Sequence, residues 1–342
     1  MDTSGFAEVV VELVDAFDMF ATLRLTPGDQ GDTPRTESVG DIFYAGGSPV
    51  PANDTFKHVD QRINQVLDDI GWPAAKRDIF SGNVTVQEEV YERDGQAMQI
   101  LADASDAEFP DVSRLYCTVN NDVAFRGRFA RFFPNNPGYG ITTWDVGGAA
   151  QAAADNTVVK VQNFTFRRSS EDIINVATAL PKGLEDGDVP GQKVEDATSI
   201  AKFWRRPWTA EGLLTWKGHD DVGDPVLAAP ETKKFAEFKV ANFKDPKTRI
   251  EQLTVTWQNP DGFSGPANWA FLQAVELSDL LSVVTSHPGG GGFDEDYYVE
   301  AIREVDEPGP EASIHKVTMQ IDVSPKAFYA SNPFGEVDIG VS

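Results

Sequence analysis

The chain has 342 residues, 41% hydrophobic and 24% charged, a globular composition with room for two or three domains. Its 29 Lys and Arg residues face 54 Asp and Glu residues, so the net charge is −25 and the pI is near 4.4. This excess of acid disfavours binding to nucleic acid or to an anionic membrane. Two interpretations stay open: charge that keeps the protein soluble, or an acidic channel wall along which DNA slides.

The first residues predict a strand over 7–14, followed by a short amphipathic helical turn that Asp15 can cap. Residues 25–55, rich in Gly, Pro, Asp and Thr, predict a long connection. No basic segment precedes an apolar run at the start, and no stretch reaches the roughly 18 apolar residues of a membrane-spanning helix. We therefore expect a soluble product made in a cytoplasm.

The clearest helix is expected over 55–71, because apolar residues recur there on one face of a 3.6-residue period. Thr55 is the expected N-cap, and Gly71 followed by Pro73 is expected to end the helix. A second helix is expected over 95–107.

A β-hairpin is predicted next, with strands over 114–119 and 123–129 joined by the turn residues 120–122. The Gly-, Pro-, Asn- and Ala-rich residues 134–156 predict a loop or domain junction. A helix is predicted over 231–243. Further strands are predicted over 158–167, 171–180, 250–257, 270–274, 280–285, 297–305 and 314–323. The last five are short and regularly spaced, which favours a barrel or sandwich.

Cysteine, histidine and glycine-run residues, which often form catalytic, metal or phosphate sites, occur here without the spacing of a known motif. Cys117, the single cysteine, lies in an apolar run and is expected in the core. The glycine run 289–292 lacks a following Lys-Ser/Thr and predicts a flexible hairpin tip. No zinc-type spacing occurs among the histidines, which are His58, His219, His287 and His315.

Three acidic clusters could hold calcium, but none has the order of an EF-hand, so solvated loops are the favoured interpretation: residues 186–188, 220–221 and 294–296. No Gly-x-Ser-x-Gly elbow occurs. The sequence therefore assigns no catalytic, cofactor-binding or metal-binding residue.

Trp204 and Trp208 flank Arg205 and Arg206. Trp and Arg are enriched at interface hot spots, so this segment could be a contact surface. The equal alternative is cation–π packing inside the fold.

Several segments in one order resemble the tail-hub, or minor tail, proteins of long-tailed phages that infect actinobacteria. The most specific is Arg62–Pro73, which reads Arg-Ile-Asn-Gln-Val-Leu-Asp-Asp-Ile-Gly-Trp-Pro, followed by Arg77-Asp78-Ile79 and Gly82. The others are Leu101–Ala107, Leu115–Tyr116, Val123–Arg128, Ile173–Asn175, Asp196–Ile200, Pro246–Ile250, Val275–Asp279, Val283–Val284, Pro288–Gly291, Tyr298–Ile302 and Val323–Pro325. Together they cover roughly residues 7–328.

This resemblance implies an α+β fold, predominantly β, with tail-hub-like β-barrel domains and an inserted small helical and hairpin domain. Residues 276–279 would turn into a barrel strand, and Ser324-Pro325 would end the last one. The expected division is a partial first barrel and loop over 1–55, a helix-helix-hairpin domain over 56–133, a β-rich segment over 134–230 and a C-terminal barrel over 231–342. Ser278 departs from the pattern, because glycine is usual there.

The implied function is that of a baseplate hub, a structural and non-enzymatic subunit of the virion tail tip that lines the DNA exit channel. Such hubs form homotrimers, and two barrels per subunit mimic the six-fold symmetry of the tail tube. The implied partners are distal-tail and tail-tube proteins, the tape-measure protein and receptor-binding proteins, with no cofactor, no specific nucleic-acid binding and no stable membrane insertion. Two alternatives stay open, a tail-associated cell-wall or glycan hydrolase and a carbohydrate-binding adhesin that uses several of the seven tryptophans.

Overall fold

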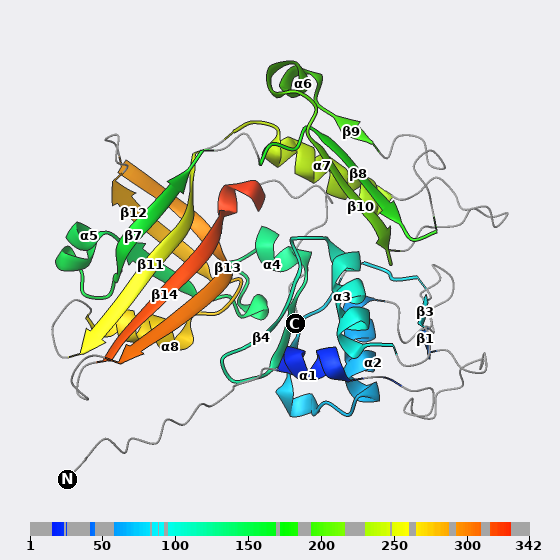
Figure 1. Cartoon of the computed structure of the whole chain (residues 1–342), viewed down its shortest axis with the longest axis horizontal. Coiled ribbons are helices and arrows are strands. Elements are labelled where there is room, and N and C mark those ends of the chain that lie inside the picture. Colours follow the sequence, from blue (N-terminus) through cyan, green and yellow to red (C-terminus); the bar gives the residue numbers. More distant parts are fainter. Residues whose placement is uncertain are drawn as a thin grey trace, which may run out of the picture.

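The chain is mixed α and β, mostly β, and its described residues form three units (Figure 1). A computed structural model describes residues 16–23, 25, 42–44, 58–82, 84–87, 89–91, 95–168, 172–183, 193–215, 230–246, 248–259, 265–286, 292–308 and 315–329. Within these residues no helix is both long and apolar enough to cross a membrane.

The largest unit is a closed β-barrel with the strand order β11-β14-β13-β12-β6-β7. Its strands are β6 (Thr143–Gly147), β7 (Val159–Arg167), β11 (Arg249–Asn259), β12 (Leu280–Ser286), β13 (Gly292–Pro308) and β14 (His315–Pro325). Alternation of inward and outward residues explains the core, since Met319, Ile321 and Val323 are buried along β14 while Asp322 between them is exposed. β6 closes the barrel by pairing in parallel with both β12 and β7.

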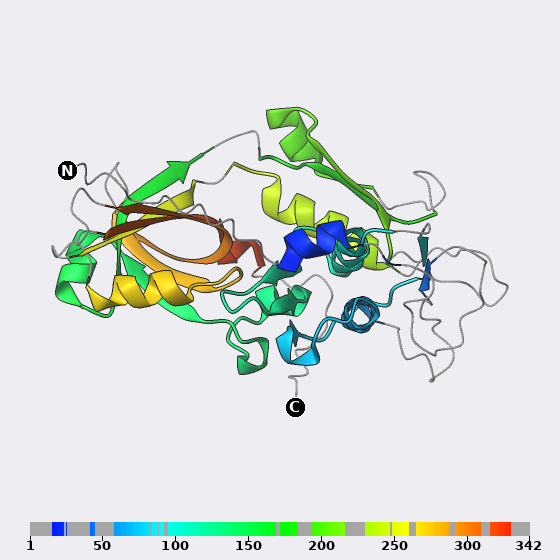
Figure 2. The ribbon, with the colours of Figure 1, turned by 60° about the horizontal axis from the view of Figure 1, so that its bottom comes forward.

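Helix α8 (Pro266–Ala274) lies against the barrel, and α5 (Ala149–Ala154) joins β6 to β7 (Figure 2). Asn268 is almost fully buried and attaches α8 to two strands. Its amide accepts a hydrogen bond from the Lys160 N–H at 2.8 Å and donates to the carbonyls of Lys160 and Thr256 at 2.9 and 3.2 Å. Phe271 on the same helix is fully buried and makes an edge contact with Trp144 at 5.2 Å.

The second unit combines helices with a three-stranded sheet of order β2-β5-β4. Its elements are α1 (Ala16–Thr22), α2 (Val59–Asp69), the 3-10 turn η1 (Ala74–Lys76), β2 (Arg77–Ile79), α3 (Ala97–Glu108), β4 (Arg114–Cys117), β5 (Val123–Arg126), α4 (Arg128–Phe132) and η2 (Pro137–Tyr139). Two short strands, β1 (Ile42–Tyr44) and β3 (Glu89–Tyr91), pair beside it. The core of this unit includes Phe20, Ile63, Leu67, Leu101 and Phe125.

The third unit is a sheet of order β10-β8-β9 packed on α7 (Pro230–Phe243). Its strands are β8 (Val176–Pro181), β9 (Val194–Glu195) and β10 (Pro207–Leu213), and the short helix α6 (Ala197–Phe203) lies beyond β9 at the top of Figure 1. β8 and β10 run in parallel. Ala177 of β8 packs against Ala236 and Val240 of α7.

Most predicted elements are present. The hairpin 114–129 forms as β4 and β5, with Asn121 in the turn at φ 58°. The helix predicted over 95–107 is α3, the helix over 231–243 is α7, and strands form at six of the seven further ranges. The predicted hairpin around the glycine run is also present, because β12 and β13 pair from Ser286 and Gly292 onward.

Three predictions are wrong. Residues 134–156 do join the helical unit to the barrel, as a junction would, but they are not a loop, because they contain β6 and α5. Residues 270–274 are not a strand but the end of α8, which Pro266 begins at a position where proline favours helix. The helix predicted over 55–71 begins at Val59, so its N-cap is His58 and not Thr55.

The barrel also takes β6 and β7 from the segment 134–230 that was expected to precede it, and it is the one closed barrel among the described residues. The strand predicted over 7–14 and most of the connection 25–55 lie outside the described residues.

Candidate functional site

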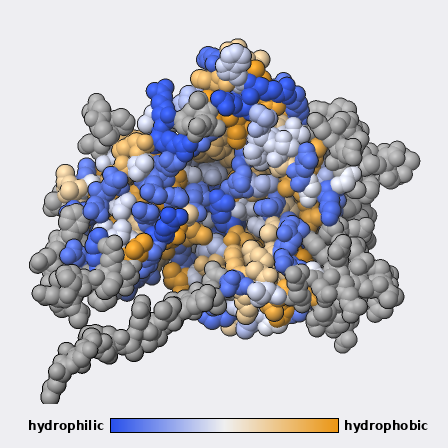
Figure 3. Space-filling view, viewed as in Figure 1, coloured by the Kyte–Doolittle hydropathy of each residue, from blue (hydrophilic) through white to orange (hydrophobic). Residues whose placement is uncertain are grey.

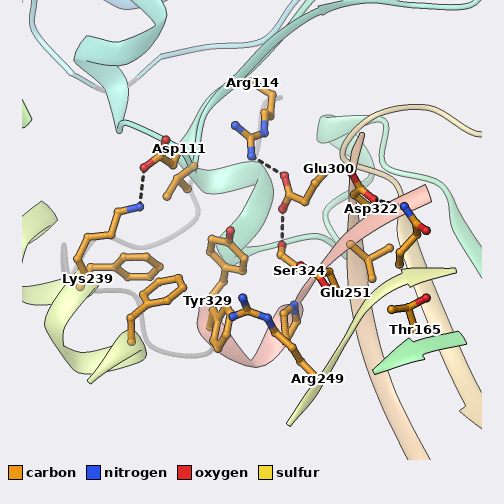
Figure 4. Close-up of a pocket in the computed structure, with 17 residues that line it drawn as sticks. Asp111, Arg114, Thr165, Lys239, Arg249, Glu251, Glu300, Asp322, Ser324 and Tyr329 are labelled. Atoms are coloured by element: carbon orange, nitrogen blue, oxygen red, sulfur yellow. Dashed lines mark hydrogen bonds and ion pairs between the residues drawn. The ribbon is translucent and has the colours of Figure 1, made fainter. Parts of the chain in front are cut away.

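The main cleft lies where the three units meet and has a volume of about 550 Å³ (Figures 3 and 4). One wall comes from β11, β14 and the 3-10 turn η3 (Lys326–Tyr329), and the opposite wall comes from α7 and the segment that leads into β4. Its lining contains both aromatic and charged side chains. The lining residues on which the description below depends are Asp111, Arg114, Lys239, Arg249, Glu251, Glu300, Asp322 and Tyr329.

Glu300 is the centre of this cleft, and a β-bulge places it there. The pairing of β13 with β14 shifts register between Val299 and Ala301, so Glu300 is the extra residue of the bulge. Such bulges redirect a side chain out of the alternating pattern. Figure 4 shows its carboxylate directed toward Arg114 and Ser324.

Two arginines from the helical unit bind this one carboxylate. Arg131 reaches both oxygens, with nitrogen–oxygen distances of 2.7 and 3.0 Å, and Arg114 binds one of them. The Ser324 hydroxyl donates a further hydrogen bond to Glu300. The Arg131 side chain is 1% exposed and lies over the rings of Tyr298 and Tyr329 at 4.5 and 5.4 Å.

The charge state of Glu300 follows from these contacts. Burial alone would raise the pKa of its carboxyl, but Arg131 and Arg114 outweigh burial and lower the pKa to about 2. Glu300 is therefore ionised at neutral pH and has no proton to give as a general acid. The neighbouring Tyr298 and Tyr329 hydroxyls stay protonated, because burial raises their pKa.

The other carboxylates of the cleft are also engaged. Asp111 binds Lys239 at 2.8 Å, and Asp322 accepts a hydrogen bond from the Gln252 amide at 2.8 Å. Glu251 pairs with Arg167. These contacts hold strands and helices together across the cleft.

A second polar cluster lies where the chain enters β12, in the turn predicted at 276–279. Asp279 is 5% exposed and accepts hydrogen bonds from the Thr142 N–H at 3.1 Å, the Trp144 ring N–H at 3.0 Å and the Glu276 N–H at 3.0 Å. Ser278 has φ 74°, which explains why glycine suits this position in the resembling proteins. The prediction of a turn into a barrel strand is confirmed.

The two tryptophans of the predicted contact surface, Trp204 and Trp208, differ in their exposure. Trp208 is half-buried against α7, and the cation over its ring is Lys239 at 5.1 Å, so packing within the fold describes this residue. Trp204 is 83% exposed and ends α6. Arg205 and Arg206 beside it are exposed as well.

The tryptophans do not form one binding face. Trp144 packs on Phe271 in the barrel, and Trp257 packs on Trp269 with ring centres 4.4 Å apart. Trp204 lies at the end of α6 in the third unit, and Trp216 lies outside the described residues. The multi-tryptophan surface of an adhesin is therefore not formed by the described members.

Other candidate residues have structural positions. His58 is the N-cap of α2, and Cys117 is half-buried against the core of the helical unit. His315 begins β14, while His219 and His287 lie outside the described residues.

Of the acidic clusters, residues 186–188 and 220–221 also lie outside the described residues. Residues 294–296 belong to strand β13 and not to a loop, which corrects that expectation, and Asp296 pairs with Lys326 at 3.0 Å. The part of the chain that the structure describes holds no group of three or more His, Cys, Asp or Glu residues arranged for a metal ion.

Subunits that assemble permanently commonly bury large apolar faces in their interfaces, and no such face appears within the described residues. The large exposed hydrophobic residues are dispersed over the three units: Met19, Val119, Trp204, Trp269, Val284 and Val305. Sequence reasoning missed Glu300, Arg114 and Arg131. The one available signal was Arg131 within the aromatic run 129–133, where an unpaired charge would be costly to bury.

No protein-family model and no curated protein matches the sequence. Solved structures that resemble the fold include three phage-related proteins. A tail protein from Neisseria meningitidis shares 11% identity over 79% of this chain and 69% of its own, with a TM-score of 0.45. A 43 kDa prophage MuSo2 tail protein from Shewanella oneidensis shares 14% identity over 84% and 67%, with a TM-score of 0.45.

The third is prophage tail protein gp18 from Listeria monocytogenes, at 9% identity over 76% of this chain and 64% of its own, with a TM-score of 0.35. This chain therefore spans about two thirds of each of these proteins. Similarity at these values does not by itself imply a shared function.

Proposed function

We propose that the chain is a structural subunit of a phage tail tip, a baseplate hub that connects the end of the tail tube to host-recognition parts. The observation that carries the proposal is the ordered set of tail-hub-like segments, because several of them lie where the fold needs those residues. In the Arg62–Pro73 segment, Arg62 is fully buried and donates to the Gln87 carbonyl at 3.2 Å. Gly71 adopts φ 71° just past the end of α2.

The same logic applies to the barrel segments. The turn at 276–279 leads into β12, and β14 ends at Pro325, since proline cannot continue an internal ladder. The ion pairs of the central cleft support a structural role, because they hold three units in a fixed arrangement. A rigid connector needs such an arrangement more than it needs a reactive group.

The proposed assembly is a homotrimer around the tail axis, with tail-tube, tape-measure and receptor-binding proteins as neighbours and no catalytic activity of its own. Three copies would carry 3 × −25, or −75, net charges. Acidic side chains along the axis would keep DNA from adhering in transit. The electrostatic potential of the lumen wall in the assembled ring tests this step, and a basic wall would contradict it.

The test of the function is the composition of the native particle. Mass spectrometry of purified tails is expected to give three copies of this chain per tail, and immunogold labelling is expected to mark only the tip. Copies distributed along the tube, or a particle without the chain, would refute a tail-tip position. The purified chain incubated with cell-wall glycan is expected to release no sugars; release would favour the hydrolase instead.

A further inference from the structure

The barrel is closed, yet two of its strands have an open edge along part of their length. β12 pairs with β13 only as far as Tyr298, and β6 pairs with β7 only as far as Lys160. Among the described residues, the only strand beside Ala301–Val305 of β13 is therefore β14, and the only strand beside Gln162–Thr165 of β7 is β11. An open edge presents backbone N–H and C=O groups with which a strand of another chain can pair.

The two open edges bound one four-stranded sheet. β7, β11, β14 and β13 lie side by side across the barrel in Figure 1, and each is antiparallel to its neighbour. Because four strands alternate in direction, β13 runs opposite to β7. A second copy in the same orientation would therefore bring its β7 antiparallel to β13, and the sheet would continue from copy to copy without a reversal.

The pairing register places the two edges at the same level along the strands. Three rows of paired residues cross the whole sheet from one open edge to the other: Thr165, Gln252, Asp322 and Ala301; Phe164, Leu253, Ile321 and Ile302; and Asn163, Thr254, Gln320 and Arg303. In a neighbouring copy at the same level, the first residue of each row would lie opposite the last residue of that row. No shift along the strands is needed.

The side chains at the two edges are compatible with this pairing. Phe164 and Ile302 pack against the barrel core and are only partly buried. Side by side they would form an aromatic and β-branched pair, which stabilises adjacent strands. Thr165 and Ala301 are exposed and small, so they leave room for two backbones to approach. Val305, on the open stretch of β13, is 46% exposed and would gain cover as well.

The charge of the two edges favours a second copy as the partner. The whole chain carries a net charge of −25, so most surfaces of two copies repel each other. Residues 162–165 read Gln-Asn-Phe-Thr, without a charge and without the lysine or proline that commonly protects an edge strand. The two charged residues of 301–305 are Arg303 and Glu304, whose charges cancel. Two copies can therefore approach at these edges.

We propose that the open edge of β13 in one copy pairs with the open edge of β7 in the next, so that neighbouring barrels share one continuous sheet. Two different edges meet in this contact, so it is head-to-tail, and repetition generates a ring when the rotation closes. This inference rests on the proposed homotrimer and names the contact that builds it.

Disulfide cross-linking tests the contact directly. Asn163→Cys and Arg303→Cys are combined in a chain that also carries Cys117→Ser, so no other thiol remains. Within one copy the two positions are three strand spacings apart, about 14 Å, which is too far for a disulfide. Mild oxidation is expected to give bands of two and three copies on a non-reducing gel. In the matched control, Gln320→Cys replaces Arg303→Cys; position 320 is in the same row but on the inner strand β14, and no such bands are expected.

A charge pair tests the register without a cross-link. Thr165→Lys with Ala301→Lys sets like charges across the joint, whereas Thr165→Lys with Ala301→Glu sets opposite charges there. Sedimentation velocity over a concentration series is expected to show that the like-charged variant associates roughly 5-fold more weakly. The like-charged variant has the smaller net charge, so repulsion between whole copies predicts the opposite order. Thermal melting monitored by circular dichroism checks that both variants fold.

The failures are distinguishable. Absence of cross-linked bands, equal bands in the Gln320→Cys control, or weaker association of the oppositely charged variant refutes the edge contact and leaves the tail-tip function standing. Cross-linked trimers of a chain that is absent from purified particles would refute the function and leave the contact standing.

Discussion

At the scale of single residues, Glu300 shows how one carboxylate can join separate units. It belongs to the barrel, while Arg114 and Arg131 belong to the helical unit. Burying such charges is costly, and the cost is offset only when partners and hydrogen bonds are complete. The Ser324 hydroxyl and both oxygens of Glu300 take part, so removing the Glu300 carboxylate leaves Arg131 buried without its ion-pair partner.

Glu300→Gln is therefore expected to lower the free energy of unfolding by about 3–5 kcal/mol at pH 7, as measured by urea denaturation. The folded-state pKa of about 2 lies below the ordinary value of 4.5, so the ionised carboxylate stabilises the fold above pH 4.5. This contribution is lost as pH falls from 4.5 to about 2. The variant should lack that part of the acid sensitivity, and an identical pH profile would contradict the assignment.

Replacing Ser278 by glycine is expected to stabilise the fold. Its φ of 74° is strained for serine, it is 2% exposed, and its hydroxyl has no hydrogen-bond partner among the described residues. Ser278→Gly is expected to raise the free energy of unfolding by about 1–2 kcal/mol, after the entropy cost of glycine is subtracted. Ser278→Ala removes the hydroxyl and keeps the strain, so it is expected to gain less in the same denaturation experiment.

At the scale of elements, the glycine just past the end of α2 contributes to the stability of the fold. Gly71 has φ 71°, and an added Cβ would meet no atom within 4 Å, so only backbone strain opposes a side chain. Gly71→Ala is expected to destabilise the fold by about 1–2 kcal/mol in thermal or urea unfolding. Gly292→Ala is the control, because its Cβ also meets nothing and its φ is not in the left-handed region. Equal losses in both variants would contradict the explanation.

Sequence patterns predicted those elements that are determined by residues close together in the chain. The hairpin turn at 120–122 and the apolar face of α2 depend on neighbours in the chain, and both were correct. The end of α8 resembles a strand in sequence because its apolar run is short, whereas Pro266 at its start is the residue that favours a helix. β6 was missed because its parallel neighbours β12 and β7 supply the stabilisation that its five residues lack.

The central cleft could not be predicted in this way. Arg131 and Glu300 are far apart in the sequence, and the bulge that directs Glu300 toward the arginines leaves no clear signature in residues 298–302. The exposed Trp204 was a candidate from composition, whereas its strained backbone and the buried Asn175 that holds it require the tertiary structure.

At the scale of the whole molecule, the net charge of −25 predicts how the chain behaves in solution. Near pH 4.4 the positive and negative charges balance, and the repulsion that keeps copies apart disappears. Light scattering across a pH series at low salt is expected to show maximal aggregation near that pH. A maximum elsewhere would show that exposed charge is not what keeps the chain dispersed.

The order of strands around the barrel has a consequence for synthesis on the ribosome. β6 and β7 are translated first, yet β6 needs β12 beside it, and β7 needs β11, which in turn pairs with β14 at residues 315–325. The barrel cannot close until β14 has been synthesised, so a product interrupted before residue 315 exposes unpaired strand edges. In the proposed role, such fragments would lack the finished shape that neighbouring subunits recognise, so completion of the barrel would decide which copies can assemble.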